Sequence, residues 1–278
     1  MSFQPTIPLP GIAGWRFLER TQAAQQAAFD KGAELKRDIA YFEANIGGVT
    51  SAAELVGDRR LLKVALGAFG LEGELDKRAF IRKVLEEGTT EPRAFANRLT
   101  EPAYAKLSEA FGFGDPGGAR TGESGFAARI TDAYRTRAFE AAVGETSNDL
   151  RLAMNFRREM VEMSRGPDGA NWFSVLGSKP LRQVFEKAYG LPAAFAKIDV
   201  DRQREVMRDK TAALFGTDKL TAFQDPAAVE KVINRFLARA QIEAGAAAAG
   251  PASAALTLLQ NASGEASQGL FNLLAARS

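Results

Sequence analysis

Residues 58–71 read DRRLLKVALGAFGL, and this stretch describes a helix together with both of its ends. Asp58 is a residue type whose side chain accepts hydrogen bonds from the free N–H groups of a first helical turn. The apolar residues that follow recur at helical spacing and predict one buried face. Gly70 can adopt the left-handed conformation that ends a helix, and Leu71 stands where a Schellman motif packs an apolar residue against the last turn.

Two further stretches repeat this pattern. Each has a capping residue, eleven residues, and a glycine with an aromatic residue before it and a large apolar residue after it. They read TEPAYAKLSEAFGF at residues 100–113 and SKPLRQVFEKAYGL at residues 178–191. Thr100 and Ser178 are the predicted caps. Pro102 and Pro180 fall in the predicted first turn, where a missing N–H is tolerated.

The spacing of the copies bears on the architecture. Gly70 and Gly112 are 42 residues apart, whereas Gly112 and Gly190 are 78 residues apart. A weaker fourth copy spans residues 132–144. Open solenoids repeat at a constant period, and the alternating pattern of strands is absent from the sequence. The sequence therefore predicts an all-α protein, a compact multi-helix bundle built from degenerate repeated helical units, without a substantial sheet.

Further helix signals lie outside the copies. The spacing of apolar residues predicts one long helix from Trp15 to Ile46 and another over residues 77–87. Ser51 and Glu54 fit a capping box. Two acidic-proline pairs, Glu91-Pro92 and Asp225-Pro226, also fit helix starts.

These signals divide the chain into four regions. We expect an extended arm and helix at 1–50, a first helical repeat region at 51–113, a second at 126–243, and an Ala/Gly-rich tail with a short apolar helix at 244–278.

The composition excludes several chemistries. The chain has 278 residues, of which 46% are hydrophobic, so it can bury a substantial core. It has neither cysteine nor histidine, which excludes disulfides, thiol nucleophiles, Ser-His-Asp triads and zinc sites built on these residues. The net charge of +2 comes from interspersed charges and argues against a nucleic-acid partner.

No motif for catalysis or for a cofactor is apparent, and we expect no cofactor. There is no P-loop and no run of apolar residues long enough to span a membrane, and the proline-rich N-terminus is not a cleavable signal peptide. Asp199-Val-Asp201 is interpreted as a solvated helix start rather than a calcium loop. Arg157, Arg158 and Glu159 are interpreted as an exposed helix face with i,i+4 ion pairs.

The aromatic–glycine stretches could also suggest a ligand pocket. We interpret them as helix ends, because the caps, the glycines and the residues after them all fit that role. Coordinates that show these stretches lining a solvent-reachable cavity, with ionisable side chains gathered around it, would contradict this interpretation.

Apolar residues near the two ends of the chain are the candidates for partner contacts. Trp15 is compatible with a core anchor or with an interface residue, since aromatic residues near termini serve both roles. The tail carries apolar clusters on either side of a Ser/Gly break, and a helix this short is marginal alone in water. The candidate contact residues are Trp15, Phe17, Leu18, Leu256, Leu259, Leu270 and Phe271.

Several long segments resemble the DUF1217 family, an uncharacterised and mainly alphaproteobacterial group. The resemblance is carried by FQPTIPLPGIAGWRFLERT, GDRRLLKVALGAFGL, FIRKVLEEGT, LSEAFGFGD, TRAFEAAVGE, the stretch 172–191 and DPAAVEKVINRFLARAQ, and it covers most of residues 3–243. Members are often encoded in flagellar gene clusters, so the resemblance implies a flagellar association. It implies no catalytic residues, and Thr100 stands where many relatives have an acidic residue.

The expected function is therefore a non-enzymatic, flagellum-associated role through protein–protein contacts. Two alternatives stay open: an export chaperone or adaptor for a flagellar subunit, and a carboxylate-based enzyme with a small-molecule, Mg²⁺ or Ca²⁺ site. Homo-oligomerisation is also left open. The localisation, cytoplasmic or flagellum-associated, is not fixed by the sequence, because flagellar export uses no cleavable signal.

Overall fold

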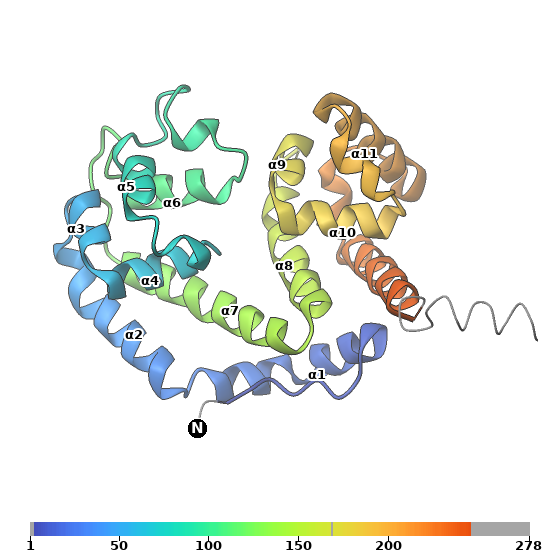
Figure 1. The fold of residues 1–278 in the computed structure, drawn as a ribbon, viewed down its shortest axis with the longest axis horizontal. Helices are drawn as coiled ribbons and strands as arrows, with labels where there is room; N and C mark the ends of the chain where they lie inside the picture. The colour runs from blue at the N-terminus through green and yellow to red at the C-terminus, as the bar shows by residue number, and fades with distance from the viewer. Residues whose placement is uncertain (1–2, 168, 246–278) are drawn as a thin grey trace, which may run out of the picture.

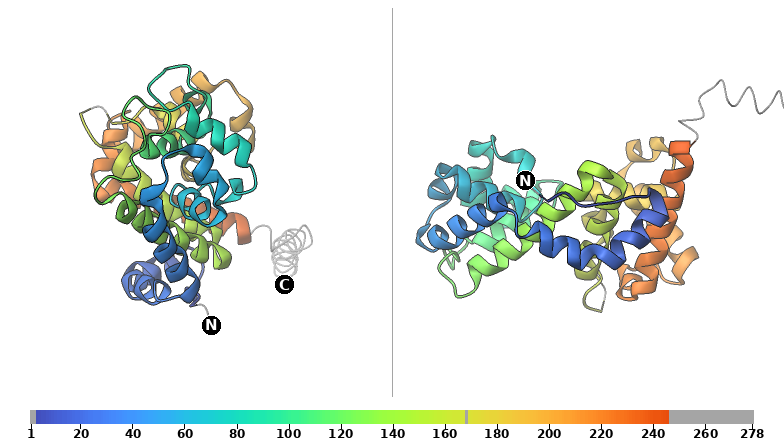
Figure 2. Two further views of the ribbon diagram at one scale, coloured as in Figure 1. Left: turned by 90° about the vertical axis from the view of Figure 1, so that its left-hand side faces the viewer. Right: turned by 90° about the horizontal axis from the view of Figure 1, so that it is seen from below.

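The computed structural model describes residues 3–167 and 169–245. These residues form α-helices and short 3-10 helices joined by loops, without a strand, so the all-α prediction is confirmed for the described part of the chain. The helices gather into two lobes (Figure 1). Two long helices, α1 (Gly11–Phe29) and α7 (Phe126–Thr146), run along one side and connect the lobes, which lie end to end along the long axis (Figure 2).

The first lobe contains the helices between α1 and α7. They are α2 (Ala33–Asn45), η1 (Ile46–Gly48), α3 (Ala52–Gly57), α4 (Arg59–Gly67), η2 (Glu72–Glu74), α5 (Arg78–Glu86), η3 (Ala96–Arg98) and α6 (Ala103–Phe111). Their buried side chains form one continuous hydrophobic cluster, to which the first half of α7 adds Phe126, Ile130 and Tyr134.

The second lobe contains the helices that follow α7. They are α8 (Asn148–Met163), α9 (Trp172–Gly177), α10 (Lys179–Tyr189), η4 (Ala193–Lys197), α11 (Val200–Phe215), η5 (Leu220–Gln224) and a terminal helix described over residues 226–245. A separate hydrophobic cluster fills this lobe, and Phe139 and Val143 from the second half of α7 belong to it. One helix therefore contributes to both cores.

The predicted helix from Trp15 to Ile46 is wrong, because the chain turns after Phe29 and begins a new helix at Ala33. The N–H of Gly32 donates to the Phe29 carbonyl at 2.9 Å in this turn. The turn sends α1 to the second-lobe core and α2 to the first-lobe core, while Phe29 packs against both. Residues of the predicted region 1–50 therefore pack into both lobes. The predicted region 126–243 is also divided, because the first half of α7 packs in the first lobe.

The predicted ends of the first copy are confirmed. The Asp58 carboxylate accepts hydrogen bonds from the N–H groups of Arg60 and Leu61, at 2.8 and 3.1 Å. Gly70 has φ +74°, and the N–H of Leu71 donates to the Leu66 carbonyl at 2.9 Å, as a Schellman motif requires.

Gly190 ends the third copy in the same way, with φ +66° and the Leu191 N–H donating to the Glu186 carbonyl at 2.9 Å. Asp199 caps α11, as predicted, and Asp225 accepts from the N–H of Ala227 at the start of the terminal helix.

Other predicted helix starts differ from the structure wholly or in part. Thr100 is not a cap, because α6 begins only at Ala103, after Pro102. Ser178 is the N-cap residue of α10, as predicted, but its side chain forms no capping hydrogen bond. Glu91-Pro92 leads into a turn and the short η3 instead of an α-helix. The weak fourth copy at 132–144 lies within α7 and contains no helix end. A shared repeated unit stays a prediction.

Candidate functional site

The first feature of the site is a cavity of about 400 Å³ between the lobes. The end of the first aromatic–glycine stretch and the starts of the other two line it. Those residues are Phe69, Gly70 and Leu71, then Pro102, then Ser178 and Pro180. Ionisable side chains line it too, and this arrangement contradicts the interpretation of these stretches as helix ends and not pocket walls: they end or begin helices and also form the walls of a cavity.

Glu159 on α8 is the centre of a charged cluster beside this cavity. Its Oε2 accepts from Nζ of Lys106 on α6 at 2.8 Å, and its Oε1 accepts from Arg137 on α7 at 3.1 Å. Arg158 donates to the same Oε1 at 2.5 Å. The side chain of Glu159 is only 10% exposed. One buried carboxylate therefore joins a first-lobe helix, the connecting helix and a second-lobe helix.

A second carboxylate supports the cluster from α7. Arg158 donates two hydrogen bonds to Glu140, Nε to Oε1 at 2.8 Å and Nη2 to Oε2 at 2.9 Å, a bidentate arrangement. The side chain of Glu140 is 7% exposed. Because both carboxylates are buried and paired, removal of either one would leave the largely buried cations with less compensating charge.

The electrostatics of Glu159 indicate a structural role. Burial acts to raise its pKa, but the charges of Lys106, Arg158 and Arg137 outweigh burial and lower the pKa to about 2. A general acid or base at neutral pH needs a pKa near the working pH. Glu159 stays ionised far below that range, so it is poised to hold cations and not to exchange protons.

Glu101 lies at the boundary between the two lobes, where α6 and α10 begin. This boundary, which includes Glu101 and the charged cluster of Glu159, is called the seam. Its carboxylate interacts with the backbone N–H groups of Ala103 and Lys179, the first residues of α6 and α10. Burial raises the pKa of Glu101 despite these contacts. One carboxylate thus faces a helix N-terminus from each lobe, where the helix dipoles favour negative charge.

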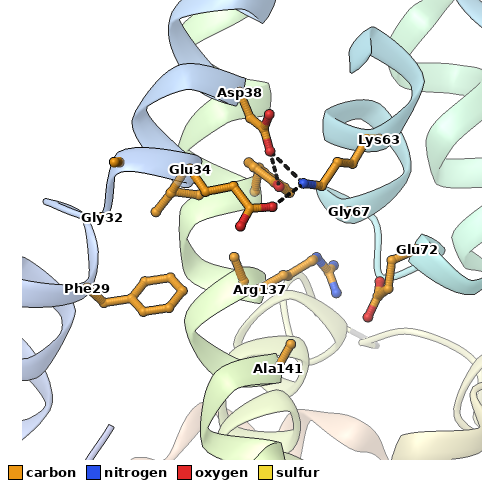
Figure 3. Close-up of a pocket in the computed structure, with 13 residues that line it drawn as sticks. Phe29, Gly32, Glu34, Asp38, Lys63, Gly67, Glu72, Arg137 and Ala141 are labelled. Atoms are coloured by element: carbon orange, nitrogen blue, oxygen red, sulfur yellow. Dashed lines mark hydrogen bonds and ion pairs between the residues drawn. The ribbon is translucent and has the colours of Figure 1, made fainter. Parts of the chain in front are cut away.

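A second cavity of about 320 Å³ lies on the first-lobe side of Arg137 (Figure 3). Its walls are largely apolar, and Arg137, Glu72 and Ala141 line both cavities. Lys63 crosses the upper part of this cavity and donates to Glu34 at 2.9 Å and Asp38 at 2.7 Å. Burial lowers the pKa of Lys63, but the hydrogen bonds to Asp38 and Glu34 raise it overall.

Gly67 gives this second cavity its shape. A Cβ atom at Gly67 would lie 2.6 Å from the ring of Tyr134, so only glycine allows the ring to pack on α4. The hydroxyl of Tyr134 donates to Asp38 at 3.4 Å. The ring and the carboxylate therefore connect the wall of the cavity to the Lys63 ion pairs.

Comparison with known proteins identifies the family to which the chain belongs. The profile of a family described as "Protein of unknown function (DUF1217)" matches residues 68–229, more than half of the chain. The chain belongs to the DUF1217 family. A crystal structure of protein AGR_C_984 from Agrobacterium tumefaciens, a structural genomics target, is similar to it with a TM-score of 0.72 and 26% sequence identity. That match covers 86% of this chain and 99% of the other. No curated protein matches.

The predicted partner-contact residues of this DUF1217 protein lie in different places. Trp15 and Leu18 are 1% and 0% exposed in the second-lobe core, so they are unavailable to a partner in this fold. The indole N–H of Trp15 donates to Glu230 at 3.1 Å, and Arg157 stacks on the indole ring at 4.3 Å. Phe17 is half-buried. The other four, Leu256, Leu259, Leu270 and Phe271, lie outside the described residues.

The interpretation of Arg157, Arg158 and Glu159 as an exposed face is wrong. Arg157 bridges Glu19 on α1 and Glu230 on the terminal helix, while Arg158 and Glu159 belong to the buried cluster. Apart from the contact between Arg158 and Glu159 themselves, their partners lie on other helices, which i,i+4 spacing within α8 does not reveal.

Sequence reasoning missed Arg137 and Glu140 altogether. A faint signal exists, because both lie on the stretch TRAFEAAVGE, where the spacing of three places them on one face of a helix.

Among residues 3–167 and 169–245, no three side chains of the types that bind metals gather closely enough to hold an ion. Over that part of the DUF1217 chain, no helix combines the length and apolar character needed to cross a bilayer.

Proposed function

We propose that this DUF1217 protein is a non-enzymatic component of the flagellar system that acts through contacts with other proteins. The flagellar part of the proposal rests on the family resemblance, whose members often lie in flagellar gene clusters. The non-enzymatic part is supported by the pairing within the charged cluster. Glu159 and Glu140 each hold cations that also brace the helices, and neither is free to act on a substrate.

The observation that carries the protein-contact part is a pair of exposed apolar side chains near the place where the start of α1 lies against the terminal helix. Leu9 is 52% exposed and Ile242 is 71% exposed. Gly11, two residues after Leu9, lies against Gln241, the neighbour of Ile242: a Cβ at Gly11 would be 2.6 Å from the Gln241 side chain. Large apolar side chains that gather on a surface mark interaction sites.

The N-terminal arm is held firmly enough to present Leu9. Thr6 and Gln25 form two hydrogen bonds, from the Thr6 N–H to Oε1 at 2.7 Å and from Nε2 to the Thr6 carbonyl at 3.1 Å. The Gln25 amide thus fixes the extended arm on α1. A preorganised surface loses less entropy on binding than a free segment.

Deletion of the gene and complementation would test the proposal. We expect the deletion strain to swim poorly and the wild-type gene to restore swimming. A Leu9→Glu/Ile242→Glu double variant should fold but fail to restore it, because charge at both positions opposes apolar contact. Ile198→Glu, at an exposed apolar residue outside this pair, is the matched control and should complement. Normal swimming and normal filaments in the deletion strain would contradict the proposal.

A further inference from the structure

The second cavity, of about 320 Å³, has largely apolar walls. The ring of Phe29 points into it from the end of α1 (Figure 3), and Leu35 on α2 and Ala138 on α7 line it as well. An apolar cavity of about 150 Å³ is large enough for one benzene molecule. The second cavity therefore has room for a body of about two fused rings.

The charges on the α2 and α4 side of this cavity offset one another. Nζ of Lys63 lies 2.9 Å from Oε1 of Glu34 and 2.7 Å from Oδ2 of Asp38. Asp38 is the more deeply buried of the two acids, and it also accepts a hydrogen bond from the Tyr134 hydroxyl at 3.4 Å. Glu34, the acid in excess, is 74% exposed and therefore solvated by water. A charged ligand would find no buried ion here that needs a partner.

The charges on the α7 side are balanced as well. Arg137 donates to Glu159 and belongs to the charged cluster described above. The cations of this cluster are Lys106, Arg137 and Arg158, and its carboxylates are Glu140, Glu159 and Glu162. Their formal charges cancel. Glu72, the remaining acid on the cavity wall, is exposed and hydrated. Arg137 therefore has no surplus charge to offer to an anion.

A charged ligand would lose its hydration in the second cavity without gaining an unpaired ion in return, and that loss is costly. An apolar body gains instead from leaving water. We propose that the second cavity binds an uncharged aromatic molecule of about two fused rings. The rings of Phe29 and Tyr134 favour an aromatic ligand, because pairs of rings attract each other beyond the burial of their area. The site is independent of any flagellar role.

Indole compounds that differ only in their side chain test the preference for an uncharged ligand. Tryptophol carries a neutral hydroxyl, tryptamine an ammonium group and indole-3-acetate a carboxylate. The amide NMR signals of Gly32 and Gly67 report on binding because both residues line the cavity, while Gly216 in the second lobe is the reference. We expect tryptophol to shift the Gly32 and Gly67 signals and to bind at least about 5-fold more tightly than either charged compound. Equal or tighter binding of a charged compound overturns the proposal.

A cavity-filling variant locates the site. Ala138 lines the second cavity and not the cavity between the lobes. Ala138→Leu should weaken tryptophol binding at least about 10-fold, because the leucine side chain occupies the same space. Ala128→Leu, at an exposed position of the same helix, is the matched control and should leave binding unchanged. Wild-type affinity in Ala138→Leu, or no shift of the Gly67 signal up to about 10 mM tryptophol, overturns the proposal.

Removal of a cation tests whether the pairing of charges causes the preference. Lys63→Met keeps an unbranched side chain but leaves Asp38, which is 13% exposed, without its cation. Tryptamine should then bind at least about 5-fold more tightly than it binds the wild-type protein, while the affinity for tryptophol changes little. Lys36→Met, at an exposed position of α2, is the control and should leave both affinities unchanged. This gain of binding is measurable even if Ala138→Leu fails to fold. The proposal is overturned if tryptamine gains no affinity for Lys63→Met.

Discussion

The two lobes share one local arrangement in different surroundings. In each, a six-residue helix ends at a glycine. One residue in an extended conformation then separates it from a longer helix, which ends near a glycine in the left-handed conformation. In the first lobe these helices are α3 and α4, and in the second they are α9 and α10. The interrupting residues, Asp58 and Ser178, are 120 residues apart, as are Gly70 and Gly190. Matching local sequence therefore produces matching local structure.

The lobes differ in how their charges are placed. In the first lobe Lys63 is 39% exposed and Glu34 is 74% exposed, so their ion pair is open to solvent. The second lobe meets the first through Glu159, which is 10% exposed and contacts three cations. Exposed pairs contribute little to stability, whereas breaking a buried pair is costly. The comparison teaches that the seam depends on buried charge and the first lobe on apolar packing.

The largest effect is expected for Glu159→Gln. The substitution removes the negative charge that Arg137, Lys106 and Arg158 share and leaves these largely buried cations undercompensated, so we expect a loss of about 3 kcal/mol in the free energy of unfolding. Glu34→Gln is the matched change in the first lobe and should cost less than about 1 kcal/mol. Urea unfolding measures both. Equal losses for the two variants would remove the distinction between the seam and the first lobe.

The sequence predicts the helix ends but not the contacts at the seam, because helix ends depend on neighbouring residues and the seam joins residues far apart in the chain. The hydrogen bonds of Asp58 reach two and three residues along the chain, and the Gly70 turn involves residues within one helical turn, so local residue types determine them. The partners of Glu159 on other helices are 22 and 53 residues away, and Trp15 meets Glu230 215 residues away. Such contacts depend on how the helices assemble, which periodicity does not encode.

Acid should weaken the seam through the same carboxylate. The folded pKa of Glu159 is about 2, below the ordinary value of 4.5, so its contribution to stability is complete above about pH 4.5 and is lost as the pH falls towards 2. The difference corresponds to about 3 kcal/mol. Urea unfolding at about pH 7 and about pH 3 should show a larger loss for the wild-type protein than for Glu159→Gln. If the wild-type protein and Glu159→Gln lost the same amount of stability between these two pH values, groups other than Glu159 would dominate the loss of stability in acid.

A smaller effect is expected where the two short helices end. Gly57 has open space around it, but a Cβ at the matching Gly177 would lie 2.3 Å from the Thr100 carbonyl of the first lobe. Gly177→Ala should therefore push the lobes apart and cost about 2 kcal/mol. Gly57→Ala should cost nothing or add about 0.5 kcal/mol, since alanine restricts the unfolded chain. Thermal unfolding compares the pair, and a stable Gly177→Ala protein would mean that the seam tolerates separation.

The smallest effect separates the two interrupting residues themselves. The Asp58 carboxylate accepts two backbone N–H bonds and also the hydroxyl of Tyr41 at 2.6 Å, whereas the Ser178 side chain accepts none at the start of α10. Asp58→Ala should cost about 1 kcal/mol and Ser178→Ala less than about 0.5 kcal/mol. Urea midpoints resolve this difference.

The second lobe needs a cap at Ser178 less than the first lobe needs one at Asp58. Pro180 has no N–H group for a cap to satisfy, and the Glu101 carboxylate already faces the N–H group of Lys179. If Ser178→Ala lowered the free energy of unfolding as much as Asp58→Ala, Pro180 and Glu101 would not be sufficient to replace a side-chain cap. That result would also show that the helix starts in the two lobes depend on the same interaction.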